Sequence, residues 1–402
     1  MVRLSTAALP VLLLLCSTTA AAQDFGTQWI DRVTHQLLDY DAPLDPYPLS
    51  AQLSFGEVYT YDSNIFLTHT DRTNDSVFLT FGQVIVKYAE VNWDLEADLT
   101  VNYNAYVDTT DANTDEERFF GRVRMQGSTL SMQLSEVARR ESSPTDVVFT
   151  DRARRFLSDT TPEVIFRLND DFAMEGVSTI EYVHYQAAEF QPSDNINTHS
   201  IGTIAYSMKR NALDALVQVG YITINYTDSN SAPDARGWLM RIGVRGDVAP
   251  DLSVVLLAGV SDMGSEHDSI TGEKTHLTTA DVEVHIAYKA LESVTAYADY
   301  TRRPGFSTNG ASFQTVDSSS AILEYAARED LKLRARLQYD RVHTSTGERR
   351  AYYSATLGPE YRLMERITLE AHATYRFGVT PGSNDAGSFT DAILSAGIAA
   401  TF

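Results

Sequence analysis

A repeated alternation of apolar and polar side chains constrains the fold of this chain more than any other feature. Over residues 366–377, every second residue is apolar, and the residues between them are charged, polar or hydroxylated. Such alternation indicates a β-strand with one apolar face and one polar face. The same pattern occupies 95–107, 280–288 and 331–339. A strand that crosses a bilayer needs roughly 9–11 tilted residues, and the apolar rows have about that length.

The end of the chain, 391–402, alternates in the same way. Counting back from Phe402 in steps of two meets only apolar residues, at positions 400, 398, 396, 394 and 392. An apolar-faced strand that ends on a bare aromatic residue resembles the closing strand of bacterial outer-membrane β-barrels, which is also read by the barrel-assembly machinery. We therefore expect Phe402 to serve as an assembly signal, with that machinery as a partner. The preceding strands should form the barrel that this strand closes.

Residues 1–22 have the composition of a secretory signal peptide. One basic residue is followed by an apolar run at 9–15 and by three alanines at 20–22. The run is too short to cross a bilayer. The only cysteine, Cys16, lies in this segment. Cleavage after Ala22 is therefore expected to leave a mature chain without disulfides or cysteine-bound metal.

Amino-acid composition limits the classes of partner and the classes of fold that this chain can have. Without residues 1–22 the chain has 31 bases and 54 acids, a net charge of −23. This argues against a nucleic-acid partner, which needs a basic face. No later segment approaches about 18 consecutive apolar residues, so no transmembrane helix is expected. The 21 Tyr and 17 Phe in a chain only 43% hydrophobic suit a barrel with lipid-facing and water-facing residues, although they also suit a secreted β-sandwich.

The chain divides after residue 48. Within 23–48, apolar residues spaced for one helix face, from Trp29 to Leu38, precede a linker with prolines at 43, 46 and 48. One interpretation is a periplasmic N-terminal segment that leads into the barrel. The other is a helix that partly plugs the pore or docks on a partner. The alternating pattern begins near Leu49, which predicts a barrel over 49–402.

Connections of two lengths alternate along the barrel segment. The short ones fall at 89–92, 127–129, 169–171, 209–211, 249–251, 290–292, 328–330 and 364–366, and the longer ones at 62–76, 108–117, 141–154, 189–197, 227–236, 262–275, 303–312, 343–350 and 380–388. This arrangement is typical of an all-β, transmembrane, up-and-down antiparallel β-barrel, here of about 18 strands. An even count places both termini on the short-turn, periplasmic side of the outer membrane of a Gram-negative bacterium.

Three segments fit the alternation poorly. Segment 160–168 is short and contains Pro162, 130–138 puts Glu136 on its apolar face, and 53–61 puts Glu57 there. β-Bulges, or charges that lie beyond the membrane belt, would explain them. They leave a barrel of about 16 strands as an alternative.

Charged residues on the polar faces of the strands are expected to line the pore. The candidates are Asp94, Glu96, Asp98, Arg122, Arg124, Arg241, Arg245, Asp281, Glu283, Lys332, Arg334, Arg336, Arg366, Glu370 and Arg376. The acids at 94–98 are in phase with Arg122 and Arg124, so they should be cross-strand neighbours in the lumen. Two roles follow for such charges. They stabilise the wall as solvated pairs, or they impose a transverse field that filters solutes.

The chain offers little for catalysis or metal binding. No G-x-S-x-G, Walker or dinucleotide motif occurs, and the histidines at 184, 199, 285, 343 and 372 lack a sequence-near nucleophile and the H-E-x-x-H spacing. The loop 108–117 has five acids, but they do not follow an EF-hand pattern. We therefore expect no enzyme activity, no metal and no cofactor. A rim-located outer-membrane hydrolase is the least favoured alternative.

A short motif, Tyr-Asp-Ser-Asn-Ile-Phe at 61–66, stands at the end of the first expected strand, with Asp75 after it. It resembles the start of an uncharacterised family of outer-membrane β-barrel porins in which a Tyr-Asp-x-Asn-Ile-Phe element follows the first strand. Some members are linked to exopolysaccharide export. The resemblance implies passive transport or polysaccharide secretion, with an export complex as a partner. Locally, Asp62 and Asn64 can form Asx turns, and Ile65 and Phe66 can anchor the loop.

These features predict an integral outer-membrane barrel in contact with lipid and lipopolysaccharide. Its expected function is porin-like passage of small hydrophilic solutes or saccharides, since a barrel of about 18 strands can enclose an aqueous channel unless loops fold inward. The alternative is a non-conducting barrel that acts as a scaffold or partner in polysaccharide export. The candidates for aromatic girdles at the membrane interfaces are Tyr103, Trp238, Tyr288, Tyr300, Tyr339, Tyr375 and Phe377.

Overall fold

The structure, a computed structural model, describes residues 49–402 with gaps at 66, 68–71, 145–151, 187–193, 209–212, 228–233, 266–275, 307–312, 345–348 and 381–387. The expected signal peptide and the segment 23–48 lie outside the described residues. The strands are β1 (Leu49–Asp62), β2 (Asp75–Ala89), β3 (Trp93–Tyr106), β4 (Thr114–Gln126), β5 (Leu130–Pro144), β6 (Arg152–Arg167), β7 (Phe172–Tyr185), β8 (Asn195–Met208), β9 (Leu213–Tyr226), β10 (Ala235–Ala249), β11 (Leu252–Ser265), β12 (His276–Leu291), β13 (Val294–Phe306), β14 (Phe313–Arg328), β15 (Leu331–Thr344), β16 (Arg349–Met364), β17 (Ile367–Val379) and β18 (Phe389–Thr401). A short 3-10 helix, Thr110–Ala112, lies between β3 and β4.

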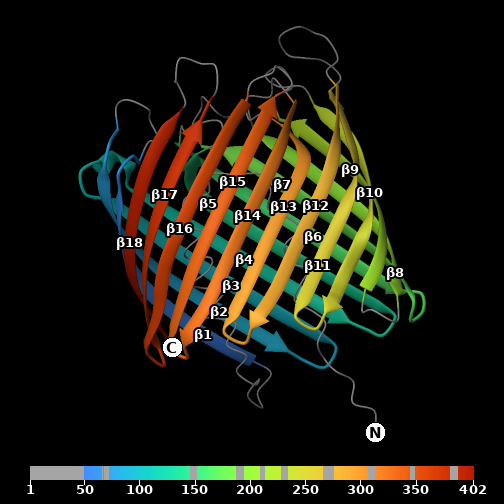
Figure 1. Ribbon diagram of the computed structural model, residues 1–402, viewed down its shortest axis with the longest axis horizontal. Helices are drawn as coiled ribbons and strands as arrows, with labels where there is room; N and C mark the ends of the chain where they lie inside the picture. The colour runs from blue at the N-terminus through green and yellow to red at the C-terminus, as the bar shows by residue number, and fades with distance from the viewer. Residues whose placement is uncertain are drawn as a thin grey trace.

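The strands close into one barrel. Each strand pairs antiparallel with its neighbours in sequence, and β1 pairs with β18, so the sheet has 18 strands and no free edge (Figure 1). This confirms the predicted all-β, up-and-down antiparallel barrel and its strand count. Closure satisfies the backbone hydrogen bonds of the wall, as a sheet inside a bilayer requires. Among the described residues, no helix is both long and apolar enough to cross a membrane.

The strand ends that are joined by short turns lie at one rim of the barrel, and the strand ends that flank the longer connections lie at the other (Figure 1). Seven of the eight predicted short turns separate consecutive strands, and the eighth, at 209–211, lies outside the described residues. Leu53 and Phe402 exchange backbone hydrogen bonds of 2.8 and 3.0 Å, so β1 starts and β18 ends at the short-turn rim. Strands run further into the long connections than predicted, and β4 begins inside the expected loop 108–117. Beyond the membrane belt both faces of a strand meet water, so the alternation stops before the strand does.

The three segments that fit the alternation poorly are complete strands. β1 carries Glu57 on its outer face, and β5 carries Glu136 there. β6 is longer than predicted, because residues of the expected loop 141–154 extend β5 and β6 instead. Pro162 lacks a backbone N–H, and the ladder between β6 and β7 is interrupted beside it.

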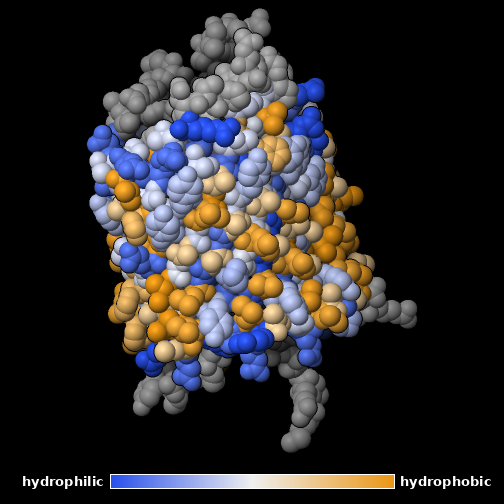
Figure 2. Space-filling model, turned by 60° about the vertical axis from the view of Figure 1, so that its left-hand side comes forward, coloured by the Kyte–Doolittle hydropathy of each residue, from blue (hydrophilic) through white to orange (hydrophobic). Residues whose placement is uncertain are grey.

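The outer face of the barrel is apolar over its middle. Large side chains at alternate positions are exposed there, for example Leu337 at 60% and Leu357 at 62%. Figure 2 shows hydrophobic residues over the middle and lower part of one side, with hydrophilic residues toward the upper rim. Tyr339, Tyr353 and Phe377 form a row of rings on this face, with centroids 4.8 and 4.5 Å apart. The distribution is that of a wall that faces lipid between aromatic girdles.

The seam between β1 and β18 has a short ladder, with nine residue pairs against fourteen between β1 and β2. At the short-turn rim, the Phe402 ring stacks on the Phe55 ring, with 5.4 Å between centroids. Arg366 was predicted to line the pore, and the structure corrects this. Arg366 lies in the turn before β17, outside the alternating strand, and its guanidinium is 5.9 Å from the centroid of the Phe402 ring.

At the opposite rim, residues of the motif at 61–66 stabilise the same seam between β1 and β18. Asp62 accepts a hydrogen bond from the backbone N–H of Asn64 at 2.8 Å, which is the predicted Asx turn. The Asn64 amide donates to the Thr390 carbonyl at 3.2 Å. Arg376 donates to Asp391 (Nε to Oδ2, 2.7 Å) and to Asp62 (3.3 Å). This seam network therefore joins β17, β18 and β1 through buried charges.

The rest of the motif fixes the first long connection. Ile65 is 2% exposed and packs against Val77 and Tyr106, as expected of an anchor. Phe66, the other expected anchor, lies outside the described residues. The Asp75 carboxylate accepts hydrogen bonds of 2.7–3.1 Å from the backbone N–H groups of 107–109. These residues therefore hold two neighbouring connections against the rim.

Candidate functional site: the charged inner wall

The polar faces of the strands form the inner wall of the barrel. Successive side chains of a strand point to opposite sides, so the residues between the exposed apolar rows face the lumen. By this criterion the structure places fourteen of the fifteen predicted charged residues on the inner face, Arg366 being the exception. Thirteen of these residues fall into four sets and the seam network, and the fourteenth, Glu370, contacts His372.

The first set lies on β2–β4, where the predicted cross-strand neighbours are confirmed. Arg122 lies 2.7 Å from Glu96, and Arg124 lies 2.7 Å from Asp94. Asp98, one inward position further along β3, accepts a hydrogen bond at 2.8 Å from the amide of Gln83. Each arginine thus faces a carboxylate across the ladder, and this part of the wall carries both signs of charge.

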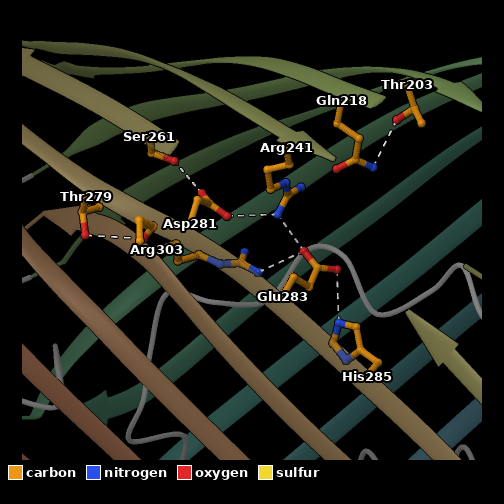
Figure 3. A network of polar contacts seen from close by, with 10 residues as sticks. Thr203, Gln218, Arg241, Ser261, Thr279, Asp281, Glu283, His285 and Arg303 are labelled. Carbon is orange, nitrogen blue, oxygen red and sulfur yellow. Dashed lines mark hydrogen bonds and ion pairs between the residues drawn. The ribbon is translucent and has the colours of Figure 1, made fainter. Parts of the chain in front are cut away.

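The second set lies on β10–β12 (Figure 3). The Arg241 guanidinium lies 2.8 Å from Glu283 and 3.3 Å from Asp281. Asp281 also accepts a hydrogen bond from Ser261 on β11 at 2.5 Å. The three charged residues are at most 3% exposed, so their mutual pairing compensates for the water that they have lost.

His285 extends this second set toward β13. Its Nε2 lies 3.1 Å from Glu283, and its Nδ1 lies 2.8 Å from Asp299 (Figure 3 shows the contact with Glu283). An ionised carboxylate only accepts hydrogen bonds, so both ring nitrogens are placed to donate. Arg303 on β13 adds a cation 3.7 Å from Glu283. Asp299 and Arg303 were not among the predicted pore residues: Asp299 is marked only by its inward phase, and Arg303 fell in the expected connection 303–312, whereas β13 continues to Phe306.

The third set includes a contact between strands that are not neighbours. Arg245 on β10 lies 2.6 Å from Glu175 on β7 and 3.2 Å from Asp214 on β9. The contact with Glu175 therefore passes over β8 and β9 on the inner side. Neither acid was predicted. Asp214 is the direct partner of Arg245 in the β9–β10 ladder, whereas a partner three strands away, such as Glu175, depends on the tilt and stagger of the barrel. The local alternation therefore contains no record of the contact with Glu175.

The fourth set lies on β14–β16. Arg334 forms an ion pair with Glu324 on β14, and Lys332 lies 4.0 Å from Glu360 on β16. Arg336 continues the same inward row on β15. Around the barrel, most of the predicted bases therefore have a carboxylate within ion-pair distance.

Several histidines are oriented by acids. His184 Nδ1 lies 2.6 Å from Asp194, and His372 Nε2 lies 2.8 Å from Glu370, the predicted wall acid on β17. Among the described residues, neither these two rings nor His285 has a serine hydroxyl as a hydrogen-bond partner. Over the same described ranges, no group of three or more His, Cys, Asp or Glu residues is arranged to hold a metal ion.

Similar barrels occur among solved structures at low sequence identity. OccK1 (OpdK) of Pseudomonas aeruginosa is 10% identical over 88% of this chain and 99% of its own, with a TM-score of 0.49. The FrpB iron transporter of Neisseria meningitidis is 6% identical over 89% and 82%, with a TM-score of 0.49. OmpT of Vibrio cholerae, an outer membrane protein with loop L8 deleted, is 12% identical over 88% and 100%, with a TM-score of 0.43. No family model and no curated protein matches this chain. The sequence identities and TM-scores give no information beyond the closed barrel that the strand order already shows.

Proposed function

We propose that this protein is an outer-membrane channel for the passive passage of small hydrophilic solutes or saccharides. The proposal rests on the opposite character of the two faces of one closed barrel, apolar outward and charged or hydroxylated inward. Lipid requires the first face, and a water-filled lumen stabilises the second. A barrel of about 18 strands is wide enough to enclose such a lumen.

The pairing of the wall charges favours polar solutes of low net charge. Arg241 with Glu283, and Arg122 with Glu96, put both signs side by side. A neutral sugar can hydrogen-bond to either sign as it passes, whereas a wall of one sign would select ions of the other. We therefore expect weak charge selectivity and clear size selectivity.

The second candidate is a non-conducting barrel that serves polysaccharide export. The motif at 61–66 favours it, through its resemblance to a porin family with members linked to exopolysaccharide export. In this chain, however, Asp62 and Asn64 contact the seam, and Ile65 packs against β2 and β3. The described residues of the motif therefore make contacts within the barrel itself. The channel remains the better-supported proposal.

Liposome swelling tests the channel directly. Liposomes that contain the mature chain should swell in isotonic sugar, and the rate should fall as the sugar is enlarged from a monosaccharide to a tetrasaccharide. Size selectivity follows because the wall is rigid and the solute must pass through its cross-section. Protein-free liposomes are the control. Swelling equal to that control with every sugar would contradict the proposed function.

A further inference from the structure

A group of basic residues occupies the outer face at those ends of β13, β15 and β16 that flank the long connections. We call it the outer basic patch, and it consists of Arg302, Arg341, His343 and Arg349. Each of these residues is in phase with an outward tyrosine of its own strand, so alternation directs its side chain outward as well. The tyrosines are Tyr300, Tyr339 and Tyr353. Figure 1 shows β13–β16 side by side, with the patch on the side of the wall opposite the lumen.

The residues of the patch are close together across the ladders. Arg302 lies directly opposite Asp317 on β14, and Asp317 lies directly opposite Arg341. His343 lies directly opposite Arg349. Neighbouring strands are about 4.8 Å apart, so the backbones of Arg302 and Arg341 are about 10 Å apart. The three arginines and Asp317 give this area a net charge of +2, in a chain whose net charge is −22.

The positive charge of the patch is only partly compensated. Arg302 lies 3.4 Å from Asp317, and this carboxylate also accepts a hydrogen bond from the Tyr300 hydroxyl at 2.9 Å. Among the described residues, no carboxylate forms an ion pair with Arg341 or Arg349. The patch therefore offers two guanidinium groups to an anion from outside the barrel.

The patch lies at the depth of lipid headgroups. The rings of Tyr339 and Tyr353, with centroids 4.8 Å apart, lie on the same strands but nearer the middle of the wall. Outward rings of this kind mark the boundary between hydrocarbon and headgroups. Further toward the middle, Leu337 and Leu357 are 60 and 62% exposed. The bases beyond the rings therefore meet headgroups, and the leucines below them meet acyl chains.

The two ends of these strands differ in outward character. At the short-turn ends, outward positions hold apolar residues, for example Leu323, Leu333 and Leu363, which are 38–48% exposed. The unpaired arginines thus face the headgroups of one leaflet. In the predicted orientation, the long connections lie outside the cell, and this leaflet is the outer one.

We propose that the outer basic patch binds the phosphate groups of a phosphorylated glycolipid, the lipid A part of lipopolysaccharide. A guanidinium group can donate two parallel hydrogen bonds to a phosphate, and Arg341 and Arg349 are placed to do so. The acyl chains of the same lipid lie along Leu337 and Leu357. The proposal rests on the predicted orientation of the barrel and is independent of whether the lumen conducts.

The position of the patch favours a lipid over a soluble anion. The patch lies on the outer side of the wall, so an anion that moves through the lumen does not pass it. Clusters of basic residues beside a membrane attract anionic headgroups. Several arginines beside an exposed apolar wall suit an amphiphile with more than one phosphate and several acyl chains.

Removing the unpaired arginines should weaken lipid binding. We expect Arg341→Ser with Arg349→Ser to raise the dissociation constant for lipid A about tenfold or more, which corresponds to about 1.4 kcal/mol. Native mass spectrometry of the mature chain in detergent, titrated with lipid A, measures this constant. Heat-modifiable gel mobility verifies that each variant is folded.

Arg140→Ser with Arg154→Ser is the matched control. These arginines also face outward at the same rim, with side chains 30 and 38% exposed, but both form ion pairs with Asp115. We expect this control to bind lipid A within about twofold of the wild type. Equal losses in the two double variants would overturn the proposal.

Related ligands identify the chemistry that the patch recognises. The wild type should bind dephosphorylated lipid A and phosphatidylglycerol at least about tenfold more weakly than lipid A. Equal affinity for dephosphorylated lipid A would show contact with acyl chains alone, and equal affinity for phosphatidylglycerol would show a general surface for anionic lipids. Displacement of lipid A by inorganic phosphate would show a site for free anions. Each of these three results would overturn the proposal.

Discussion

Replacing Arg376 with leucine should lower the free energy of unfolding by about 3–5 kcal/mol, the cost of leaving a buried charge without its partner. Arg376 is 7% exposed, and its Nε lies 2.7 Å from Asp391, which is 1% exposed. Asp62 loses a partner as well, at a seam that has only nine residue pairs. Urea unfolding in detergent micelles, followed by tryptophan fluorescence, measures the change.

Arg328→Leu is the matched control for this substitution. Arg328 pairs with Asp330 beside a short turn, with side chains 63 and 32% exposed, so solvent screens the pair and its loss should change the free energy of unfolding far less than the loss of Arg376. Adding Asp391→Asn to Arg376→Leu should recover part of the stability, because the second change neutralises the unpaired carboxylate. Equal stabilities for Arg376→Leu and Arg328→Leu would show that the seam network does not hold the barrel closed.

Replacing Phe402 with serine should reduce the amount of barrel in the membrane severalfold. The Phe402 ring stacks on Phe55, and its backbone exchanges two hydrogen bonds with Leu53, so it joins the last strand to the first. If the assembly machinery also reads this residue, as we propose, the loss will precede any effect on conductance. Quantitative immunoblots of isolated outer membranes, with heat-modifiable gel mobility as the sign of folding, measure it.

Leu394→Ser separates a terminal signal from a general loss of apolar surface. Leu394 lies on the same face of β18 and is 57% exposed, against 56% for Phe402. The two substitutions therefore remove similar lipid-facing area from one strand. We expect Leu394→Ser to assemble at near wild-type levels. Equal losses for both variants would contradict a special role for the final residue.

The strand count and the orientation of most strands were predictable because alternation is a local property. In β17, each residue from Ile367 to Phe377 lies on the face that its phase predicted. The prediction failed where local composition competed with that phase. The segment 141–154 was predicted to be a long connection, although residues 141–144 extend β5 and residues 152–154 extend β6. Strand ends that lie outside the bilayer have no apolar face, so the alternation of apolar and polar residues does not predict them.

Contacts between strands were predictable only for sequence neighbours in phase. The pairs of Arg122 and Arg124 with the acids of β3 follow from one hairpin. The contact of Arg245 with Glu175 crosses two intervening strands, which requires the stagger of the closed barrel. Likewise, Glu136 was seen as an exception in one segment. Its proximity to other polar residues on the outer face appears only when the strands are placed side by side.

The central claim, that this barrel encloses a water-filled path, is tested most directly by recording current across planar bilayers with single inserted molecules of the wild-type chain. The charged inner wall predicts stepwise conductance at low voltage in either direction, with little preference between cations and anions. Insertion confirmed by protein assay, but without current steps at any voltage, would contradict the claim and leave a closed scaffold as the function of this barrel.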